Sequence, residues 1–233
     1  MPDLVRQQII ALSEPDKVEG KARFFQTGAG QYAEGDQFLG IGVPALRKLS
    51  RSHRALDLDE IKTLLQDPYH EIRFFALLVM VAQFKKASPE LKLALVNLYL
   101  GNTSFINNWD LVDVSCYDLL GAYCAETETD VLITLAQSES TWERRIAIVS
   151  TYNFIRHGEL EVTLDVVDKL LPEPEVIVQK AIGWMLKEVG KRNQQLQIEY
   201  LLKQGKRMSP LTLRTALEKT EKGLRDRIYQ QLE

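Results

Sequence analysis

The sequence has few of the residues that build metal sites and disulfide frameworks. Among its 233 residues there are only two cysteines and three histidines. Cys116 and Cys124 are eight residues apart on one predicted helix, which separates them by about 12 Å and is too far for a disulfide. We therefore expect buried free thiols. The histidines follow no metal-ligand spacing, so we expect structural roles for them and neither a metal nor a cofactor (His53, His70 and His157).

Long hydrophobic runs are also missing. No stretch of 18 or more apolar residues occurs, so we expect no membrane span. The first residues, Met1–Leu4, lack a basic segment followed by an apolar one, so we expect no signal peptide and a cytoplasmic location. A hydrophobic content of 45% and a charged content of 26% are ordinary for a soluble globular protein. The length suits one large domain or a solenoid with a substantial core.

An overall excess of positive charge is missing as well. The net charge is −3, which argues mildly against a nucleic-acid partner. The distribution is uneven, because residues 180–214 contain eight Lys and Arg against two acids, a local charge of +6 that leaves −9 for the rest of the chain. This basic segment is either a nucleic-acid contact or an ordinary solvated surface.

The pattern that is present is helical almost throughout. Apolar residues recur every three or four positions and no segment alternates like a strand, so the sequence predicts an all-α protein. The Gly28–Gly35 stretch is no dinucleotide fingerprint, because no strand precedes it, and we expect a connecting loop. Helix starts are marked by a capping side chain followed by proline, or by a capping box (Asp67-Pro68, Ser88-Pro89 and Ser209-Pro210; Ser140–Glu143).

These starts recur with a period. Helices predicted to begin near residues 68, 107, 140, 174 and 209 are spaced by 39, 33, 34 and 35 residues, and each is followed by a shorter helix. Such a period is typical of HEAT-like repeats. Because one helix pair cannot bury its apolar face alone, stacked pairs form a curved surface. We predict a single domain over residues 1–233, an α-solenoid of about six HEAT-like helix pairs with a concave face.

One predicted helix combines basic and aromatic residues. After Glu175, Lys180, Trp184, Lys187 and Lys191 lie on one stripe, beside an apolar stripe (Val178, Ala181, Ile182, Met185 and Val189). Tryptophan on a polar face is unusual. Lysines suit phosphates, and the indole face suits a base, a sugar or a cation. The alternative is that Trp184 is a partly buried packing residue.

A second helix start carries an aromatic ring and an acid. Trp109 and Asp113 are four residues apart, so they share one helical stripe. Alternatively, Trp109 only staples the turn and Asp113 only pairs with an arginine such as Arg145. Asp110 lies near the helix N-terminus, where an acid is favoured anyway, and is not counted as catalytic. Further basic residues complete the candidate DNA contacts (Arg47, Lys48, Arg144 and Arg214).

Three motifs together resemble the AlkD-type DNA alkylation repair proteins: Asn108–Asp113, Trp142–Ile148 and Gln179–Trp184. The resemblance extends from about Phe24 to Arg214. It implies a horseshoe of HEAT repeats whose concave face binds duplex DNA. It also implies excision of cationic N3- or N7-alkylated purines. By this resemblance the catalytic residues are Trp109, Asp113, Arg145 and Trp184.

The implied chemistry agrees with these residues. An alkylated cationic purine leaves as a neutral base without a general acid, and one carboxylate stabilises the oxocarbenium ion and positions water. The family acts on lesions that stay stacked. We expect a monomeric, monofunctional DNA glycosylase acting on duplex DNA that contains alkylated purines. Phe24 replaces a tyrosine of some members, and the Gly28–Asp36 loop looks longer. The alternatives are a non-catalytic module that binds damaged or branched DNA, and a protein-interaction scaffold.

Overall fold

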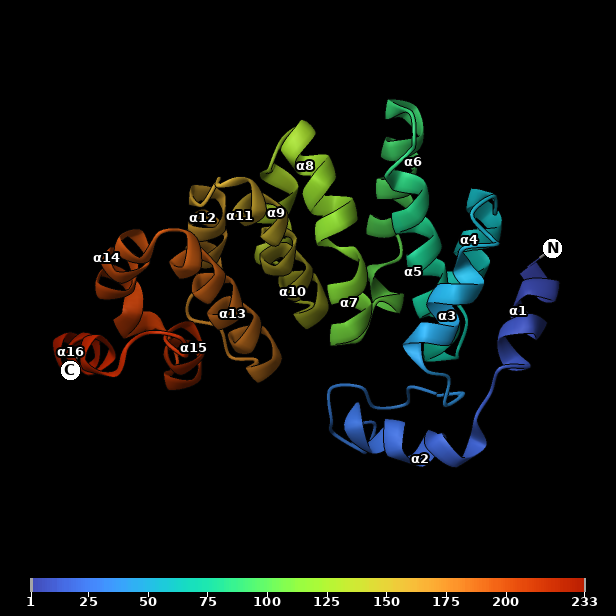
Figure 1. Cartoon of the computed structure of the whole chain (residues 1–233), viewed down its shortest axis with the longest axis horizontal. Coiled ribbons are helices and arrows are strands. Elements are labelled where there is room, and N and C mark those ends of the chain that lie inside the picture. Colours follow the sequence, from blue (N-terminus) through green and yellow to red (C-terminus); the bar gives the residue numbers. More distant parts are fainter. Residues whose placement is uncertain (1, 233) are drawn as a thin grey trace. The chain divides into compact units, whose positions relative to one another are not determined.

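A computed structural model describes residues 2–232 and shows an all-α protein (Figure 1). Within these residues no strand occurs, and the only β contact is an isolated bridge between Gln37 and Tyr69. The all-α prediction is therefore confirmed. The described residues form two compact units, one up to Ser115 and one from Cys116 on, and each is described by itself. The prediction of one domain over residues 1–233 stays a prediction.

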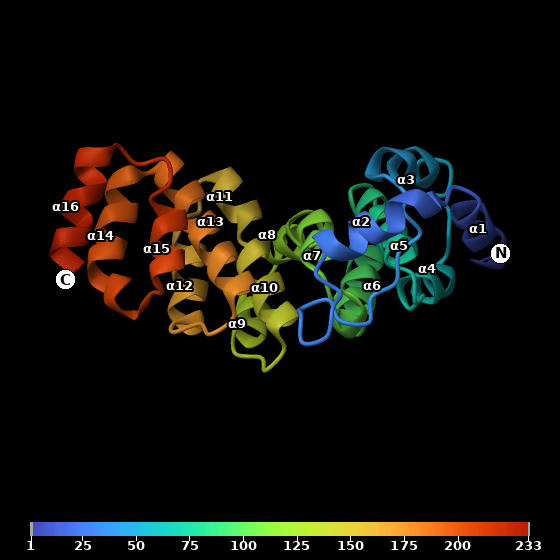
Figure 2. The same ribbon diagram turned by 90° about the horizontal axis from the view of Figure 1, so that it is seen from below.

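The first unit is built around α5. Its helices are α1 (Pro2–Ile10), α2 (Pro15–Phe24), α3 (Val43–Ser50), α4 (Leu58–Leu65), α5 (His70–Phe84), α6 (Pro89–Leu100) and α7 (Trp109–Ser115). From His70 to Met80 every residue of α5 is buried, because α3, α4, α6 and α7 all pack against it. Figures 1 and 2 show α2 lying across the ends of α3, α5 and α7.

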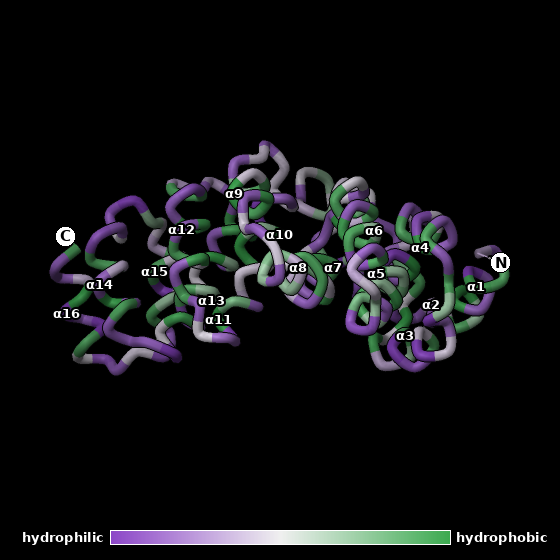
Figure 3. The backbone as a smooth tube through the Cα atoms, turned by 90° about the horizontal axis from the view of Figure 1, so that it is seen from above, coloured by the Kyte–Doolittle hydropathy of each residue, from purple (hydrophilic) through white to green (hydrophobic). Residues whose placement is uncertain are grey.

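The second unit is built around its longest helix, α13, as the first unit is built around α5. A π-helical turn (Tyr117–Gly121) leads into α8 (Ala122–Glu126), α9 (Asp130–Ala136), α10 (Thr141–Ser150), α11 (Tyr152–His157), α12 (Glu161–Leu170), α13 (Val176–Arg192), α14 (Gln194–Gln204), α15 (Pro210–Ala216) and α16 (Lys222–Leu232). Helix α13 packs against α10, α14 and α15. Gly183 allows α15 to come close, since a Cβ there would lie 2.8 Å from the Thr212 carbonyl oxygen. Along both units hydrophobic and hydrophilic segments alternate, as amphipathic helices require (Figure 3).

Two of the predicted proline starts are confirmed and one is wrong. Ser88 and Ser209 cap α6 and α15, with proline at the first position. The start at Asp67-Pro68 is wrong, because α5 begins at His70. The Asp67 carboxylate instead accepts a hydrogen bond from the Tyr69 N–H (2.9 Å). Arg73 donates to the carbonyl oxygens of both Asp67 and Pro68 (3.0 Å each). These contacts hold Pro68 in the loop before the helix.

The predicted capping box at α10 is completed through a third residue. Ser140 accepts from the Glu143 N–H (3.4 Å), as expected of the cap. The Ser140 N–H donates to the Ser138 hydroxyl (3.0 Å), which itself bonds to the Glu143 carboxylate. Ser138 therefore links the two partners that the motif predicts to bond directly.

Helices begin close to the predicted positions, at His70, Trp109, Thr141, Val176 and Pro210. Each is followed by a further helix before the next start, although α16 is longer than α15. Assignment of these pairs to HEAT-like repeats, their number and a concave face stay predictions. No helix of residues 2–232 is long and apolar enough to cross a membrane.

The predicted continuous helix through both cysteines contains the π-helical turn Tyr117–Gly121. Gly121 is required there, because a Cβ would lie 2.3 Å from the Ser150 carbonyl oxygen. Cys116 and Cys124 are both buried and neither forms a disulfide, which confirms that prediction. Burial raises the pKa of Cys124 to about 12, so it stays a thiol at neutral pH.

Candidate functional site

Trp109 lies at the start of α7, among aromatic rings. Its indole stacks on Phe25, with 5.5 Å between ring centroids and 29° between planes, and meets the edge of Phe24 at 5.9 Å. Phe24 is 64% exposed, while Phe25 is buried. Trp109 is partly exposed. Trp109 therefore packs against the rings at the C-terminal end of α2 and keeps part of its surface exposed, while a role in stapling its own helical turn stays a prediction.

Asp113 follows Trp109 by one helical turn on α7 and is also partly exposed. Leu111 and Val112, between them in sequence, are fully buried. Because residues four apart lie on one face of a helix, the acid and the indole are presented together at the surface of the first unit. This pair is the part of the candidate site that one helix positions by itself.

Beneath this pair lies a buried network of charges centred on His70. Its Nδ1 bonds to Asp36 Oδ2 and its Nε2 to Asp110 Oδ2, both at 2.9 Å. Arg73 donates to the other oxygen of Asp36 (2.5 Å). Burial by itself lowers the pKa of His70, but the bonds and charges of Asp110 and Asp36 outweigh burial and raise it. Asp110 thus has a structural role, as expected.

The same network attaches the segment between α2 and α3 to α5. The buried Glu71 carboxylate accepts from the Leu39 N–H (2.9 Å) and pairs with Lys21 (3.1 Å). Burial by itself raises the pKa of Asp36, but the bond to His70 and the charge of Arg73 outweigh it and lower the pKa. The Gly28–Asp36 loop therefore ends at a fixed carboxylate below Trp109.

In the second unit Trp184 lies beside Tyr152, which in turn lies against Tyr117, and the sequence pointed to neither tyrosine. The Trp184 ring is 5.9 Å from Tyr152, and Tyr152 is 5.5 Å from the ring of Tyr117. The Arg156 guanidinium lies over both tyrosines, at 5.2 Å and 5.5 Å, and pairs with Asp118 (2.9 Å). Tyr152 and Arg156 are four residues apart on α11, a spacing that predicts such a contact. Trp184 is half-buried, so part of its surface packs as the alternative interpretation expected.

Arg145 connects two helices of the second unit. It is 5% exposed, and its Nη1 donates to the Ile177 carbonyl in the first turn of α13 (2.6 Å). This bond joins Arg145 to the helix that carries Trp184, a structural contact different from the salt bridge to Asp113 considered from the sequence. Its pairing with Asp113 stays a prediction.

Arg144, a predicted DNA contact, bonds to groups within the second unit, and its contact with DNA stays a prediction. Its Nε and Nη2 form a bidentate pair with the buried Glu173 (2.9 and 3.1 Å), and Nη1 donates to the carbonyls of Ser138 and Glu139. Four of its five N–H groups are therefore used inside the unit. The sequence shows that Arg144 is positively charged and lies in the motif, but it does not show that Glu173 is bonded to it.

The lysine stripe of α13 is partly neutralised. Lys187 pairs with Glu218 and Lys191 with Glu188, each at 2.7 Å. Lys180 is exposed, as are the other candidate DNA contacts (Arg214 in this unit; Arg47 and Lys48 on α3 of the first). The five residues predicted for the neighbouring apolar stripe of α13 are all buried, which confirms the amphipathic pattern.

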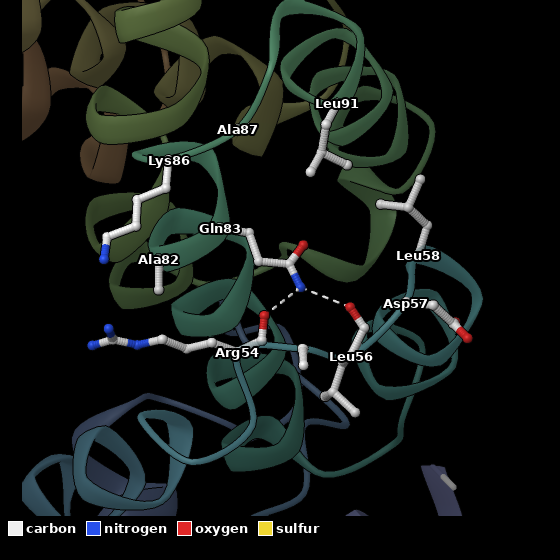
Figure 4. Close-up of a pocket in the computed structure, with 10 residues that line it drawn as sticks. Arg54, Leu56, Asp57, Leu58, Ala82, Gln83, Lys86, Ala87 and Leu91 are labelled. Carbon is white, nitrogen blue, oxygen red and sulfur yellow. Dashed lines mark hydrogen bonds between the residues drawn. The ribbon is translucent and has the colours of Figure 1, made fainter.

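A cavity of about 470 Å³ lies elsewhere in the first unit, at the C-terminal end of α5 and away from His70. Gln83 closes one side by donating to the carbonyls of Arg54 and Leu56 (3.0 and 2.7 Å; Figure 4). Its lining contains no aromatic ring, so it does not resemble the Trp109 and Trp184 surfaces. Over residues 2–232 no cluster of His, Cys, Asp and Glu has the arrangement of a metal site.

Comparison with known proteins connects this geometry to a repair function. A family model described as "DNA alkylation repair enzyme" matches residues 5–220. A solved structure described as a "Predicted DNA alkylation repair enzyme from Enterococcus faecalis" is similar in fold, with a TM-score of 0.73 and 22% sequence identity over 90% of this chain and 97% of that one. Among the curated proteins no significant match exists.

Proposed function

Because the chain belongs to the DNA alkylation repair enzyme family, we propose that it is a DNA glycosylase acting on cationic N3- and N7-alkylpurines in duplex DNA. The observation that carries this proposal is the joint presentation of Asp113 and Trp109 on the partly exposed face of α7. The carboxylate and the indole are the two groups that a positively charged sugar and base would need nearby. We further propose that the protein acts as a monomer and without a cofactor.

The proposed reaction is hydrolysis of the N-glycosidic bond. The electron pair of the C1′–N bond goes to the base, which leaves neutral because it was cationic, so no general acid is needed. Asp113 stabilises the oxocarbenium ion, positions the attacking water and takes its proton, much as a carboxylate does in glycoside hydrolysis. The product is an abasic site on an intact strand.

The two indoles have a supporting role in this proposal. Aromatic faces attract cations, so Trp109 and Trp184 would favour the charged sugar and lesion over their neutral counterparts. Phe24, beside Trp109, would add apolar surface where a tyrosine would add a hydroxyl. This proposed selectivity for charge is compatible with a lesion that stays stacked, since attraction between an indole and a positive charge requires no pocket for a flipped base.

Base release from a defined duplex tests the proposal. With one N7-methylguanine per duplex, the protein is expected to release free 7-methylguanine and to leave an abasic site without cutting the strand. A matched duplex carrying hypoxanthine, a neutral base, is expected to stay intact because its departure needs a proton donor. Salt-dependent binding without any release would select a non-catalytic DNA-binding module. No binding even at low salt would select a protein scaffold.

The salt dependence of DNA binding separates a phosphate contact from a structural arginine. Lys180→Gln is expected to weaken binding and to reduce the slope of log K against log salt by about 1, because one phosphate contact is lost. Arg144→Gln, the matched control, is expected to lower the melting temperature and to leave the slope unchanged, since it loses only internal bonds, to Glu173 and to the carbonyls of Ser138 and Glu139. Fluorescence anisotropy over a KCl series measures both slopes; equal effects of the two substitutions would contradict these roles.

A further inference from the structure

His70 occupies an unusual position, since both of its ring nitrogens face carboxylates in the interior. It is 2% exposed, and its partners come from different segments: Asp36 from the loop after α2 and Asp110 from the first turn of α7. We propose that His70, as an imidazolium, is a positioning residue that holds Trp109 and Asp113 in place for base release. This inference rests on the proposed function and adds a residue to it.

The hydrogen bonds themselves require the charged ring. A carboxylate only accepts hydrogen bonds, so each of the two bonds needs an N–H on the ring. A neutral imidazole has one N–H and can keep only one of its partners. Loss of the proton therefore releases either Asp36 or Asp110. Asp36 is 1% exposed and also bonded to Arg73, whereas Asp110 is 14% exposed, so the neutral ring is expected to release Asp110.

Release of Asp110 matters because it directly follows Trp109 in the first turn of α7. The carboxylate bond to His70 joins the N-terminal turn of α7 to the N-terminal turn of α5. Asp113 lies in the next turn of the same short helix, so a shift of the first turn moves both candidate residues. Displacements of about 1 Å can slow an enzymatic step by about a hundredfold, which makes such a fixed start important.

A second connection runs through stacked rings. His70 lies 4.6 Å from Phe38 and 5.0 Å from Phe25, centroid to centroid, and Phe25 lies 5.5 Å from Trp109. A charged imidazole is attracted to the faces of both phenylalanines, so the charge also holds the ring that supports the indole. One connection is the hydrogen bond from Nε2 to Asp110, the residue after Trp109, and the other is the contact of the imidazole ring with Phe25, which packs on Trp109.

The charged groups around His70 come from the loop after α2, from α5 and from α7. The loop after α2 contributes Asp36 and α7 contributes Asp110, both bonded to the ring. Helix α5 contributes Arg73, which is held by Asp36, and Glu71, which pairs with Lys21 of α2. Two carboxylates thus face one imidazolium directly, and Arg73 pairs with the same Asp36 carboxylate. This arrangement raises the pKa of His70 above its ordinary value of about 6.5.

Fluorine NMR of protein labelled with 5-fluorotryptophan tests the positioning directly. The three resonances are assigned with single substitutions to phenylalanine at Trp109, Trp142 and Trp184. In the wild type the Trp109 resonance is expected to shift with an inflection above pH 6.5, and the other two are expected not to follow it. His70→Gln is expected to displace the Trp109 resonance and abolish its titration. His53→Gln, the matched control, is expected to change neither, because His53 bonds to the Leu49 carbonyl.

Asp110→Asn gives a test that a general loss of stability would not reproduce. The amide can donate to a neutral ring or accept from a charged one, so the link to His70 survives in both states. We therefore expect the Trp109 titration to be smaller in this variant than in the wild type, because only the connection through Phe25 still responds to the charge of the ring, while its low-pH resonance position is kept. The single-turnover rate of 7-methylguanine release is expected to fall about ten- to a hundredfold in His70→Gln, with DNA affinity nearly unchanged. In Asp110→Asn the rate is expected to fall less than in His70→Gln and to depend less on the His70 titration than in the wild type.

The outcomes separate the two proposals. A Trp109 resonance that is unchanged in His70→Gln would overturn the positioning role, and so would a wild-type titration shared by all three tryptophans. If His70→Gln does not fold, the wild-type titration and Asp110→Asn decide the question. A wild type that releases no base overturns the proposed function, and the fluorine spectra still decide whether His70 positions Trp109.

Discussion

Replacement of Asp113 by asparagine is expected to slow the release of 7-methylguanine by about 10²–10³-fold, equivalent to about 3–4 kcal/mol of barrier. The amide keeps the size of the side chain but removes the negative charge that would stabilise the oxocarbenium ion and the group that would accept a proton from water. Asp113 is partly exposed on α7, so the substitution removes no fully buried group. Single-turnover release from an N7-methylguanine duplex measures the effect.

The control for this experiment is Asp59→Asn. Asp59 is exposed in the first turn of α4 and takes part in no proposed step. Its substitution is expected to leave the rate of release within about twofold of the wild type, as is usual for exposed positions away from a site. Affinity for an undamaged duplex is expected to be retained in both variants. Release that continues at the wild-type rate in Asp113→Asn would contradict the assigned mechanism.

Asp36→Ala is expected to be the most destabilising single change in the first unit, at about 3–5 kcal/mol. The carboxylate is 1% exposed and holds both His70 and Arg73, which are 2% and 5% exposed. Its removal leaves two cationic groups buried without their shared partner. Urea unfolding followed by circular dichroism measures the change. Asp226→Ala, exposed on α16, is the control and is expected to change the free energy of unfolding by less than about 0.5 kcal/mol.

The effect of Asp36→Ala depends on pH in a direction set by two opposite shifts. The pKa of His70 is raised on folding, so its contribution is complete below its ordinary pKa of 6.5 and is lost as the pH rises through the folded value. The pKa of Asp36 is lowered, so its contribution is complete above its ordinary value of 3.8 and is lost as the pH falls through the folded value. The difference from the wild type is therefore expected to be largest between these two ordinary values. A difference that grows toward alkaline pH would contradict the charge network.

The sequence predicts helices well because their signals are local. Ser88 and Ser209 cap helices where serine followed by proline predicts it, and the apolar stripe of α13 is buried as its spacing requires. Prediction fails at Asp67-Pro68. Arg6, 61 residues earlier in the chain, bonds to the Asp67 carboxylate, and Arg73, inside the next helix, bonds to the Asp67 carbonyl. A local pattern carries no information about such partners.

Charged residues of the candidate site show the same limit. Arg144 and Lys187 look equally available in the sequence, yet each pairs with a glutamate about 30 residues away, Glu173 and Glu218. The His70 network joins positions 36, 70 and 110 in one cluster, which no spacing rule indicates. The motifs were sufficient for the family, while the neutralising partners and the ring beside Trp184 required coordinates.

The two glutamates on the lysine stripe have a consequence for how the protein would handle undamaged DNA. Glu218 pairs with the ammonium group of Lys187 and Glu188 with that of Lys191, the groups that would otherwise bind a backbone phosphate. Any DNA lying there has to displace these internal anions first, so part of the gain from each new contact is cancelled. Under the proposed function, such a surface would hold intact DNA only briefly, and a search along the genome would not be slowed by tight binding at ordinary sites.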